Sequence, residues 1–214
     1  GVDAPILVAT GLDDAERATE LMGLGEHRTD DWDLVERLEE LGTAPGDLNH
    51  VIFTHLHYEH VAPAYLRQFP NATIYVQQRE LEHAAVPKGG KHLPVGGGGL
   101  FYDRRDVEFL CSEVWDRVVV WNGDVDFAPG VRCVLYPDTH TPGHQAVYLD
   151  TDAGTVVLTG DLVRSVELNL EKQYPPAIFY DLESMQDALA RLATDGDLYL
   201  PTHDYGVMDR ESYP

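Results

Sequence analysis

The chain has 214 residues, 43% of them hydrophobic, which suits one globular domain with a sizeable core and leaves no apolar run long enough to cross a membrane. Thirty-seven acidic residues against fifteen basic ones give a net charge of -22, so nucleic acid is excluded as an expected partner. Two cysteines, Cys111 and Cys133, fit no metal or disulfide pattern, and no signal peptide is visible; we expect reduced core thiols in a cytoplasmic protein.

The first third of the chain alternates strand and helix patterns. Residues 5–10 read as a strand, and residues 30–41 as a helix with Gly42 as its C-cap. Apolar residues recur in that helix at helical spacing and are expected to face the core: Trp32, Val35, Leu38 and Leu41. A β-branched and aromatic run then begins at residue 51 and is interpreted as a strand that leads into a group of histidines.

That group is His55-Leu-His57-Tyr-Glu59-His60. Side chains two residues apart in a strand point the same way, so His55 and His57 are expected to face one point, which Glu59 and His60 reach once the backbone turns. Neutral imidazole suits zinc, iron or nickel, so the group predicts a metal site. A hydrogen-bonded, partly buried ring is the ordinary interpretation of one histidine, but three at this spacing with a carboxylate disfavour it.

The middle of the chain holds predicted helices over 62–69 and 77–84, with a strand over 73–76 between them. His83, on the second helix, has no motif around it and is interpreted as structural or exposed. Residues 86–99 contain six glycines and His92, and no periodic structure is expected there. They are interpreted either as a lid or substrate-shaping loop or as an ordinary surface loop.

The last half is predicted to contain a helix over 102–114, an amphipathic helix over 181–193 and five strands, over 117–121, 131–136, 146–150, 155–159 and 198–201. Three further residues able to bind a metal follow or end predicted strands. They are His144, in Thr-Pro-Gly-His, Asp161, in Thr-Gly-Asp, and His203, in Pro-Thr-His-Asp.

The motif from His55 to His60, followed by His144, Asp161 and His203, resembles the metallo-β-lactamase-fold hydrolases, and within them most closely the N-acyl-homoserine lactonase branch. The resemblance covers nearly the whole chain. It implies an α/β (α+β) fold: one domain over residues 1–214, a four-layer αβ/βα sandwich of two facing mixed β-sheets with helices outside. Lactonase relatives begin with additional strands, so an N-terminal piece is expected to be missing.

The resemblance also implies two metal ions. His55, His57 and His144 would hold one, Glu59, His60 and His203 the other, and Asp161 would bridge them. Zinc is expected at both positions, with iron, manganese or cobalt as alternatives. A hydroxide bridging the metals would attack the carbonyl of a lactone or ester. His140 is usually not a ligand in such relatives.

Three positions depart from the lactonase pattern. Ala9 stands where relatives carry an aspartate that braces the metal loop, and Glu59 replaces a shorter aspartate. Arg164 replaces the tyrosine three residues after the bridging aspartate; its guanidinium could stabilise an oxyanion, bind a substrate carboxylate, or only pair with a nearby acid. Tyr174 and Tyr180 are weaker substitutes for the missing phenol. The predicted catalytic residues are therefore Asp161, Arg164 and Glu59.

Several functions remain open on these residues. A lactone or ester hydrolase acting on a small acyl substrate is favoured, and a thioester hydrolase of the glyoxalase II kind is the alternative, although this chain has few basic residues to bind glutathione. A β-lactamase fits less well, since a signal peptide would be expected. A metal-binding protein that has lost catalysis through Ala9 and Glu59 is the remaining hypothesis. No nucleic acid or membrane partner is expected, and a homodimer is left open.

Overall fold

The structure is a computed structural model that describes residues 4–214 except 24, 26, 28–31, 87–100 and 211. The predicted glycine-rich loop over 86–99, with His92, therefore lies outside the described residues apart from Val86.

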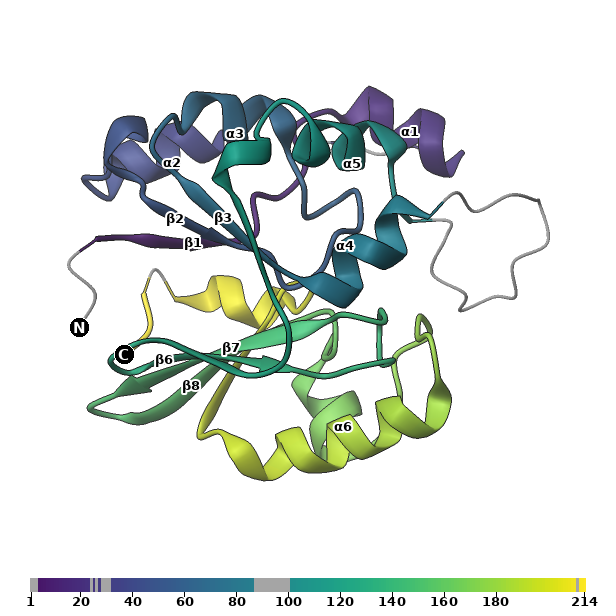
Figure 1. The fold of residues 1–214 in the computed structure, drawn as a ribbon. Coiled ribbons are helices and arrows are strands. Elements are labelled where there is room, and N and C mark those ends of the chain that lie inside the picture. Colours follow the sequence, from purple (N-terminus) through teal and green to yellow (C-terminus); the bar gives the residue numbers. More distant parts are fainter. Residues whose placement is uncertain (1–3, 24, 26, 28–31, 87–100, 211) are drawn as a thin grey trace.

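Two β-sheets form the centre of the molecule (Figure 1). The first is entirely parallel and contains, in order, β1 (Ile6–Val8), β2 (His50–Ile52), β3 (Thr73–Gln77) and β4 (Val118–Trp121). The second contains β5 (Val125–Ala128), β6 (Val131–Leu135), β7 (Gln145–Thr151), β8 (Gly154–Gly160) and β9 (Leu198–Pro201). Its strands pair antiparallel except for β8 and β9, which are parallel.

Helices cover the outer faces of the two sheets. Those associated with the first sheet are α1 (Ala15–Met22), α2 (Leu34–Glu40), α3 (Pro63–Gln68), α4 (Gln78–Ala85) and α5 (Arg104–Cys111). On the opposite side of the molecule, α6 (Leu182–Asp195) covers the second sheet, and a π-helical segment (Val166–Glu171) precedes it along the chain. The result is the predicted order of helix, sheet, sheet and helix, with α1, α2, α3 and α5 on one outside and α6 on the other (Figure 1).

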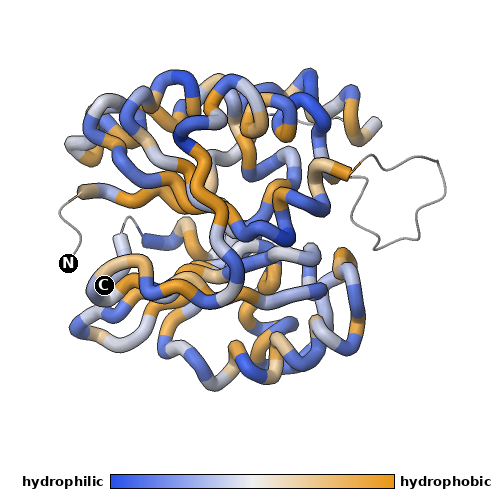
Figure 2. The backbone as a smooth tube through the Cα atoms, viewed as in Figure 1, coloured by the Kyte–Doolittle hydropathy of each residue, from blue (hydrophilic) through white to orange (hydrophobic). Residues whose placement is uncertain are grey.

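The two sheets face each other through an apolar layer. Ile52 of the first sheet packs with Val131, Cys133 and Val147 of the second, and all four side chains are buried. Hydrophobic residues follow the strands of both sheets (Figure 2), as expected for strands whose inner faces lie in the core. Both cysteines are free, and Cys133 is a core residue as predicted.

The caps of α2 explain why the predicted burial of Trp32 and Leu41 was wrong. The Asp33 side chain accepts hydrogen bonds from the N–H groups of Val35 and Glu36, so α2 begins at Leu34 and Trp32 precedes its cap. The helix ends at Glu40, which places Leu41 in the C-cap position. Trp32 and Leu41 are consequently 54% and 79% exposed rather than buried, while Val35 does pack against the core.

Other elements differ from the predictions in length or existence. β2 ends at Ile52, so the histidine motif lies in the loop after the strand and not in an extended strand. Helix α1 and strand β5 were not predicted. None of the helices in the described part of the chain combines the length and apolar character that a membrane crossing requires.

Candidate metal centre

The loop after β2, residues 53–62, brings four of the predicted ligands to one end of the sheets. His55, His57 and His60 are almost completely buried in it. The loop is held from the second sheet by Gln145, whose backbone N–H donates to the Thr54 carbonyl at 2.9 Å and whose side-chain amide donates to the Phe53 carbonyl at 2.7 Å. The histidines therefore lie on a backbone fixed by tertiary hydrogen bonds.

Metal-binding side chains gather here in two groups. The first consists of His55, His57 and His140, and the second of Glu59, His60, Asp161 and His203. Within each group, one candidate ligand atom per residue lies within 4.8 Å of every other. Six of the seven predicted ligands are thus brought together in two adjacent sets, and the first set also contains His140.

Asp161, at the end of β8, lies between the two groups. One carboxylate oxygen is 3.1 Å from Nε2 of His60, and the other is 2.9 Å from Nε2 of His203 and 3.8 Å from Nε2 of His140. Burial alone would raise the pKa of Asp161, but the charge of the His60 imidazole holds that pKa well below its ordinary value. The carboxylate of Asp161 therefore lies among imidazoles of both groups.

The histidines of the first group are held in the neutral form that binds metals. Burial, followed by the charges of neighbouring imidazoles, lowers the pKa of His55 well below the ordinary value, and burial does the same for His57. Burial lowers the pKa of His140 to about 4. In the second group burial raises the pKa of Glu59, because an ionised carboxylate is costly there unless a cation lies nearby.

Buried polar atoms without hydrogen-bond partners test whether these residues fit a metal. Buried polar atoms are nearly always hydrogen-bonded in folded proteins. Each of the seven predicted ligands nevertheless has one buried side-chain atom without a hydrogen-bond partner: His55, His57, Glu59, His60, His144, Asp161 and His203. Nitrogen-rich, thiolate-free donors with two carboxylates suit zinc or a similar divalent ion, so these residues fit the metals that the resemblance implies.

His140 and His144 lie on the same loop but have different neighbours. The Nδ1 atom of His140 is 3.1 Å from the Ile178 carbonyl oxygen, and its Nε2 atom is 3.1 Å from Nδ1 of His57. The Nε2 atom of His144 instead accepts a hydrogen bond of 3.3 Å from the Asp161 N–H, while its buried Nδ1 has no partner. The ring of His144 stacks on that of His55 with centroids 4.9 Å apart, so it is adjacent to the first group without being part of it.

Arg164 lies at the mouth of this centre. Its guanidinium is 3.2 Å from a carboxylate oxygen of Asp161, and its side chain is 38% exposed. The Arg164 N–H donates to Asn169, which fixes the backbone at the start of the π-helical segment. Tyr174 and Tyr180, considered as substitutes for a missing phenol, both have exposed side chains.

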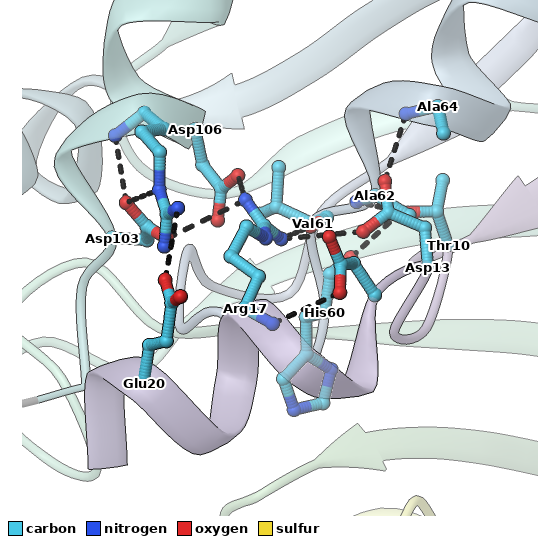
Figure 3. A network of polar contacts seen from close by, with 12 residues as sticks. Thr10, Asp13, Arg17, Glu20, His60, Val61, Ala62, Ala64, Asp103 and Asp106 are labelled. Atoms are coloured by element: carbon cyan, nitrogen blue, oxygen red, sulfur yellow. Dashed lines mark hydrogen bonds and ion pairs between the residues drawn. The ribbon is translucent and has the colours of Figure 1, made fainter. Parts of the chain in front are cut away.

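Thr10, the residue after Ala9, holds the backbone of the loop at His60 and Ala62 by hydrogen bonds. Thr10 donates to the His60 carbonyl through its N–H and its hydroxyl, both at 3.0 Å, and its hydroxyl accepts from the Ala62 N–H at 2.8 Å (Figure 3). Asp13 accepts from the Ala64 N–H at 2.8 Å. The loop is therefore held firmly on this side even though Ala9 has no carboxylate.

Arg17 extends these contacts into α5 (Figure 3). It is buried, donates to the Val61 carbonyl at 3.4 Å, and forms ion pairs with Asp13, Asp103 and Asp106. Burial raises the pKa of Asp106 to about 7, although the hydrogen bond and charge of Arg17 act in the opposite direction. Sequence reasoning missed Thr10 and Arg17 because neither is close in the chain to the loop that it contacts.

Comparison with known proteins identifies relatives of this chain. The family profile described as "Metallo-beta-lactamase superfamily" matches residues 3–203. An N-acyl homoserine lactonase of Bacillus thuringiensis is 29% identical over 199 residues, which are 89% of this chain and 71% of that protein. Another, from Azorhizobium caulinodans, is 30% identical over 154 residues, which are 68% of this chain and 53% of that one.

Solved structures agree with the sequence relatives. An N-acyl homoserine lactone hydrolase, with the product N-hexanoyl-L-homoserine bound at its catalytic metal center, superposes with a TM-score of 0.74 at 25% identity. The match covers 97% of this chain and 79% of that one. A dizinc quorum-quenching lactonase shares the fold, with a TM-score of 0.64 at 16% identity over 90% of this chain and 64% of its own.

Proposed function

This chain belongs to the metallo-beta-lactamase superfamily, and from that membership we propose that it is a metal-dependent hydrolase that opens lactones of the N-acyl homoserine class. The observation that carries the proposal is the pair of ligand groups meeting at Asp161, with a buried unsatisfied atom on each of the seven predicted ligands. The curated relatives named above are N-acyl homoserine lactonases, which supports this substrate class over thioesters and β-lactams.

Hydrolysis adds water across the ester bond of the lactone: the acyl carbon gains the water oxygen, and the ring oxygen leaves with a proton as an alcohol. Two bound divalent metals would supply a water acidic enough to act as the nucleophile at neutral pH and would polarise the carbonyl. Asp161 lies between the two groups and is the residue proposed to hold both metals at a fixed separation. Arg164 is proposed to contact the substrate oxygens, which its partial exposure and its distance of 3.2 Å from Asp161 support.

Zinc is the proposed metal at both positions because imidazole and carboxylate donors dominate and no thiolate takes part. The free cysteines support the proposed cytoplasmic location, since both stay unpaired. Glu59 lies in the second group with one oxygen unsatisfied, which supports its role as a ligand despite the longer side chain.

Metal analysis together with a substrate panel tests the proposal. We expect about two divalent ions per chain after mild dialysis, and hydrolysis of N-acyl homoserine lactones that is lost with a chelator and restored by zinc, manganese, cobalt or iron. Thioesters and β-lactams should react much more slowly in the same panel. Two metals without turnover of any member would support the degenerate metal-binding alternative, and fewer than one metal per chain with no response to added ions would overturn the proposal.

Single substitutions should separate the roles of His140 and His144. Both ring nitrogens of His140 have a neighbour in the protein, whereas the buried Nδ1 of His144 has none, so we propose His144 as the ligand and His140 as the group that orients His57. His144→Ala should lose one metal per chain. His140→Ala should keep both with weaker binding, by about 10–100-fold, as is typical when a partner of a ligand is removed. Equilibrium dialysis with zinc measures both, and the reverse result would make His140 the ligand.

A further inference from the structure

Glu80 is a completely buried carboxylate that the proposed chemistry does not use. It lies in the first turn of α4, directly after β3, with no exposed surface. Burial raises the pKa of Glu80, while the four hydrogen bonds that it accepts act against that rise. Isolated buried carboxylates are costly, so a role for this one is expected in the groups that surround it.

Those groups come from the two loops that carry the first set of metal ligands. One oxygen of Glu80 accepts from the N–H of Leu56, between His55 and His57, at 2.9 Å, and from the Tyr102 hydroxyl at 2.7 Å. The other oxygen accepts from the Thr141 hydroxyl at 2.7 Å and from the N–H of Gly143 at 3.0 Å. Glu80 therefore joins the His55–His57 segment to the segment from His140 to His144.

The second loop also contacts the backbone of Glu80 directly. A Cβ atom at Gly143 would lie 2.2 Å from the Glu80 nitrogen and 2.6 Å from its Cα, which is too close for any side chain. The backbone contact and the four hydrogen bonds together fix how far apart the two ligand loops lie. Both backbone donors can only donate, so each loop needs an accepting oxygen, and the two oxygens of one carboxyl group offer one to each loop.

We propose that Glu80 is a positioning residue for the metal centre: its carboxylate holds the His55–His57 loop and the His140–His144 loop in register, and so sets the affinity of the first metal position. The proposal rests on the metal site of the proposed function and not on its substrate. Loss of a hydrogen-bonding partner behind metal ligands typically costs about 10–100-fold in metal affinity. We expect a loss of metal affinity in this range when Glu80 is replaced, because each of the two loops is held by one of its oxygens.

Glu80→Gln is the main test because it keeps the shape and removes one of the two accepting oxygens. Zinc affinity is measured by competition with a chromophoric chelator, and the visible spectrum of the cobalt-loaded protein reports ligand geometry. We expect affinity to fall about 10–100-fold and the cobalt bands to change. Glu82→Gln, an exposed glutamate on the same helix, is the matched control and should behave as the wild type.

Thr141→Val keeps the test decisive if Glu80→Gln does not fold, because it removes a single donor and leaves the carboxylate in place. It should lower zinc affinity less than Glu80→Gln, with a melting temperature of the metal-free protein close to that of the wild type. If Glu80→Gln folds and its zinc affinity and cobalt spectrum match those of the wild type, the role of Glu80 is overturned while the proposed function stands. If Glu80→Gln does not fold, the same result for Thr141→Val has the same meaning. A wild-type protein that binds no metal would overturn this inference and the proposed function together, whereas metal binding that depends on Glu80 without lactone turnover would support the inference and contradict the function.

Discussion

Arg164→Ala should lower kcat and kcat/KM for an N-acyl homoserine lactone together, by about 10²–10³-fold, the usual cost of removing one donor to a reacting oxygen. The guanidinium lies 3.2 Å from Asp161 at the mouth of the site, where relatives are expected to carry a tyrosine. A partly exposed arginine in that place can donate a hydrogen bond to the carbonyl or leaving oxygen as negative charge develops on it. Steady-state kinetics at saturating metal measures the effect.

The pattern of the kinetic change decides between the two roles of Arg164. If it binds a carboxylate on the substrate instead, KM should rise for acidic substrates only, with little change in kcat. Metal content should stay that of the wild type in both cases. Arg104→Ala is the matched control, because Arg104 is an exposed arginine that pairs with Glu108 on the solvent-facing side of α5. Wild-type kinetics of Arg164→Ala across the panel would make Arg164 merely a partner of Asp161.

Gly143→Ala should be strongly destabilising. The added Cβ would lie 2.2 Å from the Glu80 nitrogen, and a backbone atom cannot move aside as a flexible side chain can. Overpacking of this kind costs about 3 kcal/mol or more, which for a chain of this length lowers the melting temperature by roughly 6–12 °C. Calorimetry of the metal-free protein measures it, and zinc affinity should fall as well because His144 is the next residue.

Gly46→Ala is the matched control for Gly143→Ala. A Cβ at Gly46 meets nothing within 4 Å, so this substitution should leave the melting temperature almost unchanged. A Gly143→Ala protein that melts with the wild type and binds zinc equally would show that the two ligand loops can separate without consequence. That result would also remove one of the supports for the role of Glu80.

The ligand types and their order were predictable from the sequence. Three histidines and a glutamate within one short segment, followed by Asp161 and His203 after later strands, are brought together by the fold as expected. Such motifs can be recognised in a sequence because the ability of a side chain to bind a metal does not depend on the local secondary structure. The order of the layers was also predictable, from the resemblance. The amphipathic helix α6 was predictable from its periodicity, and the burial of Met185, Leu189 and Leu192 confirms it.

Predictions that depended on the local backbone were less accurate. The run from residue 51 has strand-forming residues, but β2 stops at Ile52, and the carbonyls of Phe53 and Thr54 accept hydrogen bonds from Gln145 of the second sheet instead. Trp32 and Leu41 continue a helical pattern that the caps of α2 exclude from the helix. A pattern of apolar spacing cannot show where a competing hydrogen bond ends an element.

The sequence by itself determined which side chains can bind metal and on which kind of fold they lie. Only the tertiary structure decided which of them meet: that His140 joins His55 and His57, that Thr10 and Arg17 brace the loop behind His60, and that Glu80 joins the two ligand loops. The reason is distance along the chain. Glu80 is bonded to Gly143 across 63 residues and Thr10 to His60 across 50, and such contacts form only when the two sheets and their helices pack together.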